Sequence, residues 1–230
     1  GGGPMKEKLM NGLLTLATKL SGQRHLAVIR NSFSKLLPVI IAGSFCTLMS
    51  NIVCNATPGY VSVANLPGMS WLSRLTPIFT AANYGTMNFI AIGITILISI
   101  ELAESYGIRD ITIAPVALGA YISLCLTVAM VECEFADGGA HKVANVLALM
   151  FTDAKGLFVA LITAMCSTEL YCRLVMGGKL QIKLPESVPA NVAGSFVVLL
   201  PACITILAVS VTGFVFQKIT GMTIFDAITT

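Results

Sequence analysis

Long apolar stretches without any charged residue are the main pattern of this chain. A helix of about 20 apolar residues crosses the hydrocarbon core of a membrane, whereas so much apolar surface would not remain exposed to water. The pattern therefore predicts an all-α, polytopic membrane protein with about five transmembrane helices. We expect these spans over residues 35–55, 84–103, 110–131, 156–176 and 189–217, with a proline near the start of the first.

Two apolar segments between these spans are too short or too interrupted to cross a membrane. Residues 58–83 carry Arg74 as their single charge and contain a Leu-Pro-Gly turn, so we expect a folded loop or a partial re-entry. Residues 143–152 form a short apolar run, which we interpret as an interfacial or re-entrant piece.

The two ends of the chain differ from its apolar middle. Residues 1–4 are interpreted as a cloning scar. Residues 5–22 are too charged to span and predict an interfacial amphipathic helix, although a helix packed on the protein itself fits equally well. One face of this helix carries leucines at helical spacing: Leu9, Leu13, Leu16 and Leu20. Residues 23–217 then form the five-span unit, and residues 218–230 begin a linker or a further amphipathic helix.

The composition supports the membrane assignment. Of 230 residues, 56% are hydrophobic and only 11% are charged, whereas soluble domains carry about 25% charged residues. The mean hydropathy of +0.86 agrees. These values exclude a soluble enzyme, a disordered chain, a coiled coil and a nucleic-acid binder. The net charge of +3 is too small to indicate an acidic partner.

The distribution of lysine and arginine predicts the orientation, because cytoplasmic loops carry an excess of both. The residues on the side of the N-terminus are Lys6, Lys8, Lys19, Arg24, Arg30, Lys35, Arg109, Arg173, Lys179 and Lys183. Those on the opposite side are fewer: Arg74, Lys142, Lys155 and Lys218. We therefore predict that the N-terminus is cytoplasmic.

Small residues recur at every fourth position on two of the expected helices. The first row is Ala91, Thr95, Ser99 and Ala103, and the second is Ala160, Ala164, Thr168 and Cys172. Helices in lipid associate through small side chains, because lipid provides no hydrophobic drive for association. We therefore expect tight helix contacts at these rows rather than the polar lining of a pore.

Glu169 is the clearest ionisable residue inside an expected span. Arg173 follows it by one helical turn on the same face, which predicts an intramembrane ion pair between Glu169 and Arg173. A structural role is favoured, and a role in transport stays open. Glu101 and Glu104 are expected to end the second span in contact with solvent.

Residue types that usually carry catalysis or bind metals follow no recognised pattern. His25 and His141 lie outside the expected spans, and no nearby residue suggests that either acts as a base or a metal ligand. The seven cysteines include no CxxC pair and lie mostly in apolar stretches. We therefore expect no metal site, no cofactor, no disulfide framework and no catalytic residue.

One dense motif leads into the last expected span. Residues 182–196 read IKLPESVPANVAGSF. A proline restricts the preceding residue to extended conformations and also suits the first turn of a helix, so the motif predicts a stiff linker that enters a helix. The residues that define it are Lys183, Pro185, Glu186, Val188, Pro189, Ser195 and Phe196.

This motif resembles a signature of the lactose/cellobiose/chitobiose family of phosphotransferase-system sugar permeases, the enzyme IIC components. The family commonly has a proline where this chain has Ala190. Three further segments, at residues 24–44, 102–107 and 152–160, are similar to family sequences and occur in the same order. The resemblance therefore covers about residues 24–217.

The resemblance implies a two-domain dimer of ten spans in a bacterial inner membrane. In this family the first five spans form the scaffold and dimer interface, and the later spans carry a sugar that a separate IIB protein phosphorylates. The family's F-G-I-H-G and N-E-P segments are missing here, so the chain resembles the N-terminal half only, and no substrate-binding residue is assigned. The implied partners are a second copy of the chain, IIA and IIB proteins, and membrane lipid, but no nucleic acid.

Two other hypotheses remain open from the sequence. A standalone five-span membrane interaction module would keep the scaffold without transporting a sugar itself. An unrelated ion-coupled transporter fits less well, because such transporters usually carry paired charges inside their spans.

Overall fold

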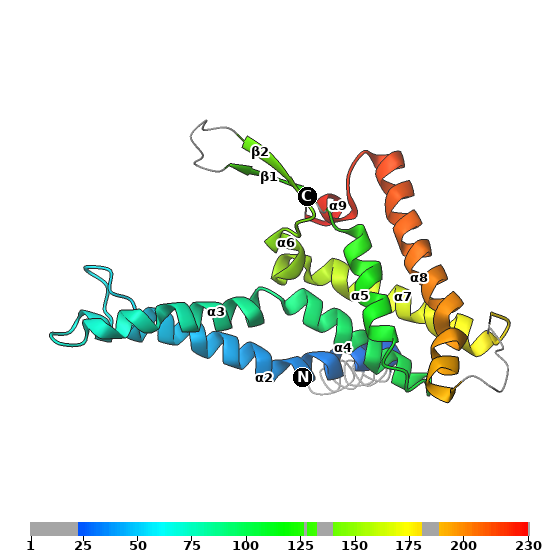
Figure 1. Cartoon of the computed structure of the whole chain (residues 1–230), viewed down its shortest axis with the longest axis horizontal. Coiled ribbons are helices and arrows are strands. Elements are labelled where there is room, and N and C mark those ends of the chain that lie inside the picture. Colours follow the sequence, from blue (N-terminus) through cyan, green and yellow to red (C-terminus); the bar gives the residue numbers. More distant parts are fainter. Residues whose placement is uncertain (1–22, 127, 133–139, 181–188, 230) are drawn as a thin grey trace, which may run out of the picture.

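The computed structural model describes residues 23–126, 128–132, 140–180 and 189–229 (Figure 1). Helices account for most of these residues, which confirms the predicted helical fold class. A long arm of two helices projects from a block in which the remaining helices pack together (Figure 1). The amphipathic helix predicted over residues 5–22 lies outside the described residues.

The arm consists of α2 and α3. α2 covers Arg24–Leu48 and is continued by a π-helical turn over Met49–Val53. It includes most of the first predicted span but begins earlier, so Pro38 lies in the helix interior and not near the start. α3, Thr76–Met87, returns along α2. Pro77 stands in its first turn, where the missing N–H is tolerated.

After the tip of the arm, the helices begin and end at other residues than predicted. The expected loop over residues 58–83 already contains most of α3, preceded by two 3-10 helices: Val63–Asn65 and Ser70–Leu75. After α3 the chain bends by 41° and continues as α4, Ile90–Ser105. The prediction of a single uninterrupted span over residues 84–103 was therefore wrong, because the helix breaks at Asn88 and Phe89.

The third predicted span, over residues 110–131, is replaced by a short helix and a strand. α5 covers only Ile113–Leu124, which is about 18 Å at 1.5 Å per residue, against roughly 30 Å for a bilayer core. β1, Val128–Glu132, soon follows and pairs in antiparallel orientation with β2, Ala140–Ala144. This hairpin is an exception to the predicted all-α fold, and the valines of β1 favour it because β-branched residues favour strands.

The rest of the chain is helical. The segment predicted as interfacial contains α6, Leu149–Thr152, and a 3-10 turn, Ala154–Gly156, follows it. α7, Leu157–Gly177, and α8, Ala190–Thr220, match the fourth and fifth predicted spans, and α9 covers Ile224–Thr229. Among the described residues, three helices are long and apolar enough to cross a membrane, or four if α3 and α4 form one broken span. This is fewer than the five predicted.

α4 and α7 pack against each other, and each carries one of the two rows of small residues. The row on α4 is fully buried, and so is the row on α7. The two buried hydroxyls of the α4 row hydrogen-bond to their own helix: Thr95 Oγ1 donates to the carbonyl oxygen of Ala91 at 2.8 Å, and Ser99 Oγ donates to that of Ile96 at 2.7 Å. The predicted tight helix contact is therefore confirmed.

The short helix α9 is fastened to the block by aromatic side chains. Phe225 is 2% exposed and meets the rings of Tyr121 and Phe151 edge-on, at centroid distances of 5.9 and 4.6 Å. The Tyr121 hydroxyl donates to the carbonyl oxygen of Phe151 at 2.6 Å. Gly156 lies against both of these groups. These contacts join α5, α6, the 3-10 turn before α7, and α9. The helix α9, which lies in the segment predicted to begin a linker or a further amphipathic helix, therefore packs on the block.

Candidate functional site

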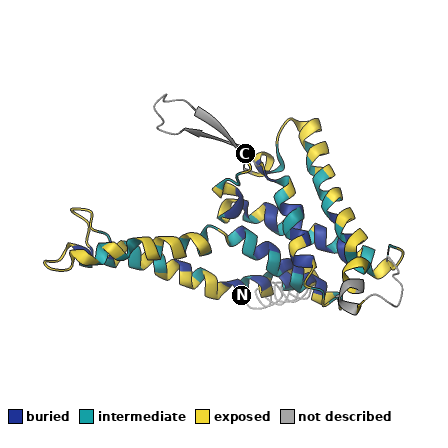
Figure 2. Ribbon diagram, in the orientation of Figure 1, coloured by how far each residue is buried: buried dark blue, intermediate teal, exposed yellow. Residues whose placement is uncertain are grey.

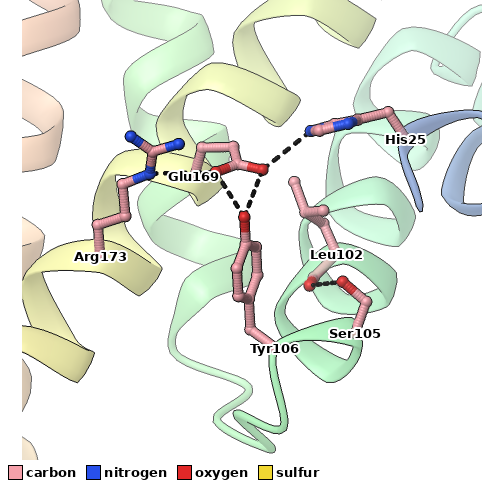
Figure 3. Close-up of polar contacts among 6 residues, drawn as sticks. All are labelled: His25, Leu102, Ser105, Tyr106, Glu169 and Arg173. Atoms are coloured by element: carbon pink, nitrogen blue, oxygen red, sulfur yellow. Dashed lines mark hydrogen bonds and ion pairs between the residues drawn. The ribbon is translucent and has the colours of Figure 1, made fainter. Parts of the chain in front are cut away.

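Polar side chains from α2, α7 and the C-terminal end of α4 meet around one carboxylate, in what we call the Glu169 cluster: Arg24, His25, Tyr106, Glu169 and Arg173. Figure 3 shows the members of this cluster except Arg24. Glu169 lies on α7 with its side chain 17% exposed. The Tyr106 hydroxyl, just after α4, is 2.7 Å from both carboxylate oxygens. His25 Nε2, in the first turn of α2, is 2.9 Å from Oε1, and Arg173 Nε is 3.4 Å from Oε2.

Tyr106 connects this carboxylate to a second cation. The Arg24 guanidinium lies 4.2 Å from the centroid of the Tyr106 ring, within the range of a cation–π contact. The hydrogen bond to Glu169, together with burial, raises the pKa of Tyr106, so its hydroxyl remains a donor. The cluster therefore ties the first turn of α2 and the end of α4 to α7.

A second ion pair joins α2 to α4. Lys35 Nζ contacts Glu101 Oε1, and the Glu101 side chain is only 10% exposed. The expectation that Glu101 is in contact with solvent was therefore wrong, and His25 has a partner, Glu169, that its neighbours in the sequence do not reveal. In both cases the partner lies on a helix that is distant in sequence: Glu101 is 66 positions from Lys35, and Glu169 is 144 positions from His25.

The turn between α4 and α5 is held by Asp110. Its carboxylate accepts hydrogen bonds from the Tyr171 hydroxyl at 2.8 Å and from the Thr112 backbone N–H at 2.9 Å. Burial raises the pKa of Asp110, but the hydrogen bonds from Thr112 and Tyr171 outweigh burial and leave that pKa below its usual value. Glu169 and Tyr171 of α7 thus hold the two ends of the turn over residues 106–112.

Acidification is expected to loosen this turn. Because the pKa of Asp110 is lower in the folded chain than in the unfolded chain, its ionised form stabilises the fold above the ordinary value of 3.8. This contribution is lost as the pH falls through the folded-state pKa. In thermal unfolding in detergent, the Tm of the wild type should exceed that of Asp110→Asn at neutral pH, and this difference should shrink as the pH is lowered. A difference in Tm that stays constant across the pH range would contradict this prediction.

The arrangement suits a structural role in the described part of the chain. Tyr106, His25 and Arg173 surround the carboxylate of Glu169, so the predicted Glu169–Arg173 contact belongs to a larger set of contacts. No group of three or more His, Cys, Asp or Glu side chains among the described residues could hold a metal ion. What these contacts accomplish is to fix the ends of helices against one another.

The residues of the sequence motif are placed only in part. Pro189 directly precedes α8 and is exposed, as are Ser195 and Phe196 in the first turns of that helix. The other motif residues lie outside the described residues: Lys183, Pro185, Glu186 and Val188. The role of the motif as a stiff linker therefore stays a prediction.

Sequence reasoning missed two tyrosines that organise the site, Tyr106 and Tyr171. Tyr106 lies in the segment over residues 102–107 that contributes to the family resemblance, and this was the only signal available. Its partner Glu169 is 63 residues away, and Tyr171 is 61 residues from Asp110. No local spacing could have indicated these pairs.

Comparison with known proteins finds sequence matches over most of the chain. The family described as "Phosphotransferase system, EIIC" matches residues 30–228. The chain is 35% identical over 202 residues to the lichenan permease IIC component of Bacillus subtilis (strain 168), covering 86% of this chain and 41% of that protein. It is 31% identical over 223 residues to the cellobiose-specific EIIC component of Geobacillus stearothermophilus, covering 95% of this chain and 46% of that protein.

A solved structure agrees with these sequence matches. The crystal structure of the transporter ChbC, the IIC component from the N,N'-diacetylchitobiose-specific phosphotransferase system, matches with a TM-score of 0.78 at 28% identity. The match covers 96% of this chain and 49% of that chain. The chain thus spans about half the length of the relatives that it matches.

Proposed function

The chain belongs to the phosphotransferase-system EIIC family, and from this membership we propose that it forms the scaffold part of a membrane permease for a disaccharide of the cellobiose, chitobiose or lactose class. EIIC components are integral membrane proteins that work with IIA and IIB partners. The permease would pass its sugar to a IIB protein for phosphorylation. The added charge would prevent the product from returning through the bilayer.

The names of the relatives support the proposed class of sugar. They are a lichenan permease, an oligo-beta-mannoside component, two cellobiose components and a chitobiose component. Apart from lichenan, which is a polysaccharide, these names denote a disaccharide or an oligosaccharide.

The observation that carries the scaffold role is the rigid connection among α2, α4, α5 and α7. α4 and α7 are in contact through fully buried small side chains, so neither can slide without opening a cavity. Glu169 and Lys35 connect α2 to the same block, and Asp110 connects the turn before α5. A block held at so many points suits the fixed part of a transporter, against which a second part moves.

We also propose that the scaffold associates as a homodimer through the α2–α3 arm, with its N-terminus cytoplasmic. The inner face of the arm is polar, since Asn83 Nδ2 donates to the Gly43 carbonyl oxygen at 3.1 Å and to Thr47 Oγ1 at 2.6 Å. The outer faces are exposed and apolar (Figure 2), with Leu37, Ile41, Phe45, Leu48, Ile52, Ile78 and Tyr84. A second copy could cover these faces, which lie beyond the reach of the block.

A chimeric permease tests the scaffold role. Residues 30–228 would replace the matching region of the Geobacillus stearothermophilus cellobiose EIIC component, in bacterial cells that lack cellobiose uptake but contain IIA and IIB proteins. We expect phosphorylated cellobiose to accumulate, and the purified chain alone to bind no cellobiose in calorimetry. Micromolar binding of cellobiose to the chain alone would overturn the scaffold role. So would a chimera that inserts and purifies as the parent does but transports nothing.

A further inference from the structure

The outer face of α7 carries a row of exposed apolar residues that ends in a cation. Phe158, Ile162 and Cys166 follow one another at every fourth position and are exposed. Arg173 lies two turns further along, with its side chain 75% exposed. The opposite face of α7 is buried against α4 and α5. The outer face of α7 is therefore apolar along most of its length and charged at one end.

The length of the row matches one leaflet of a bilayer. From Ile162 to Arg173 the helix rises about 16 Å at 1.5 Å per residue. Half of a hydrocarbon core of about 30 Å is about 15 Å. With the helix spanning the membrane, Arg173 would lie at the level of the lipid headgroups when Ile162 lies near the bilayer centre.

The charged end of the row has donors available for an anion. Arg173 directs Nε toward Glu169, while its terminal nitrogens point away from that carboxylate (Figure 3). His25 approaches from α2 with its side chain 50% exposed. Arg24, over the ring of Tyr106, adds a second guanidinium close by. Arg24 shares its own opening with Glu101 and Glu104, so the donors that an anion in the groove beside α7 can reach are those of Arg173 and His25.

An open groove connects the charged and apolar parts. It is lined by His25, Met165, Cys166, Glu169, Leu170 and Arg173. Met165 and Cys166 lie near the middle of α7, whereas Arg173 and His25 contact Glu169 closer to the C-terminal end of that helix. A groove with an apolar floor and a cationic end is complementary to an amphiphile with an anionic head.

We propose that this groove is a binding site for an anionic phospholipid, with the phosphate between Arg173 and His25 and an acyl chain along Cys166 and Ile162. Free phosphate would use the cations but not the apolar floor, so the occupant is the lipid. The lipid would bridge α2 and α7 on the side away from α4. This inference depends on the chain spanning the membrane and not on its sugar, so its failure would leave the proposed transport function standing.

Photoactivatable lipids test the site directly. The full chain is placed in phosphatidylcholine nanodiscs that contain traces of phosphatidylglycerol or phosphatidylcholine, each carrying the same diazirine in one acyl chain. Adducts are mapped by peptide mass spectrometry. We expect phosphatidylglycerol to label α7 about fivefold more than phosphatidylcholine does. This ratio corresponds to the binding free energy of about 1 kcal/mol that one lysine or arginine contributes at an anionic membrane surface. The exposed apolar face of α8, whose Phe196–Phe214 stretch contains no charge, should show no preference and serves as the internal control.

Variants separate the site from general membrane contact. Arg173→Gln should abolish the preference of α7 for phosphatidylglycerol, and Arg173→Lys should retain part of it. Arg74→Gln, a charge change at the far end of the arm, should leave it unchanged. Equal labelling of α7 by both lipids would overturn the proposal, as would full competition by inorganic phosphate. A preference that survives in Arg173→Gln, with unchanged circular dichroism and elution volume, would also overturn it.

Discussion

Gly156→Ala is expected to destabilise the folded chain by about 1–3 kcal/mol, the usual cost of forcing a methyl group into a packed site. A Cβ at this position would lie 2.6 Å from the Phe151 carbonyl oxygen, 3.0 Å from the Phe151 carbonyl carbon and 2.6 Å from the Tyr121 hydroxyl. Two of these atoms belong to the backbone, so a side-chain rotation cannot relieve the contact. Thermal unfolding in detergent would show the loss as a lower Tm.

A matched control exists on the arm. Gly85 is an exposed helical glycine of α3 with open space around its Cβ position. Gly85→Ala should leave the Tm unchanged or raise it, because alanine favours a helix over glycine by about 1 kcal/mol. If Gly156→Ala leaves the Tm unchanged or raises it, as expected for Gly85→Ala, then Phe151 and Tyr121 do not lie as close to the Cβ position of Gly156 as the structure shows.

A double variant identifies the atoms responsible. Tyr121→Phe removes the hydroxyl that the new methyl group would meet, at the cost of the hydrogen bond to Phe151. In the Gly156→Ala background this second change should therefore cost less than it does alone. Additive losses would show that the hydroxyl does not oppose the new methyl group.

Glu169→Ala is expected to have the second large effect. It leaves the half-buried Tyr106 hydroxyl without its acceptor, and a buried polar group that loses its partner costs about 1–3 kcal/mol. His25 loses the same acceptor, but its exposed ring can bond to water instead. Glu169→Gln should cost less, because its amide oxygen can still accept the bond from Tyr106. The same thermal measurement checks both variants.

Glu104→Ala provides the control for this prediction. Glu104 is exposed on the last turn of α4, close to the Glu169 cluster, and its loss should change the Tm little. A cycle that combines Glu169→Ala with Tyr106→Phe should show strong coupling, since both variants remove the same hydrogen bond. Independent effects, or a Glu169→Ala variant as stable as Glu104→Ala, would contradict the role assigned to the cluster.

The candidate site was predictable only where its partners are neighbours in sequence. Glu169 and Arg173 are one helical turn apart, so their spacing was enough to bring them together as a candidate pair. The contacts of Glu169 with His25 and Tyr106 cross from one helix to another. They depend on how α2, α4 and α7 pack, which no spacing within one helix reveals.

The sequence by itself determined that this chain is helical and lies in a membrane, because the free energy of transferring an apolar stretch into lipid depends on local composition alone. It also identified the small residues through which α4 and α7 pack, since their spacing is a property of one helix. The break at Asn88, the short α5 with its β-hairpin, and the partners of Glu101 and Glu169 were decided only by the tertiary structure. Each of these depends on which distant helix lies alongside, since a backbone bend or a buried charge is stable only when another part of the chain completes its hydrogen bonds.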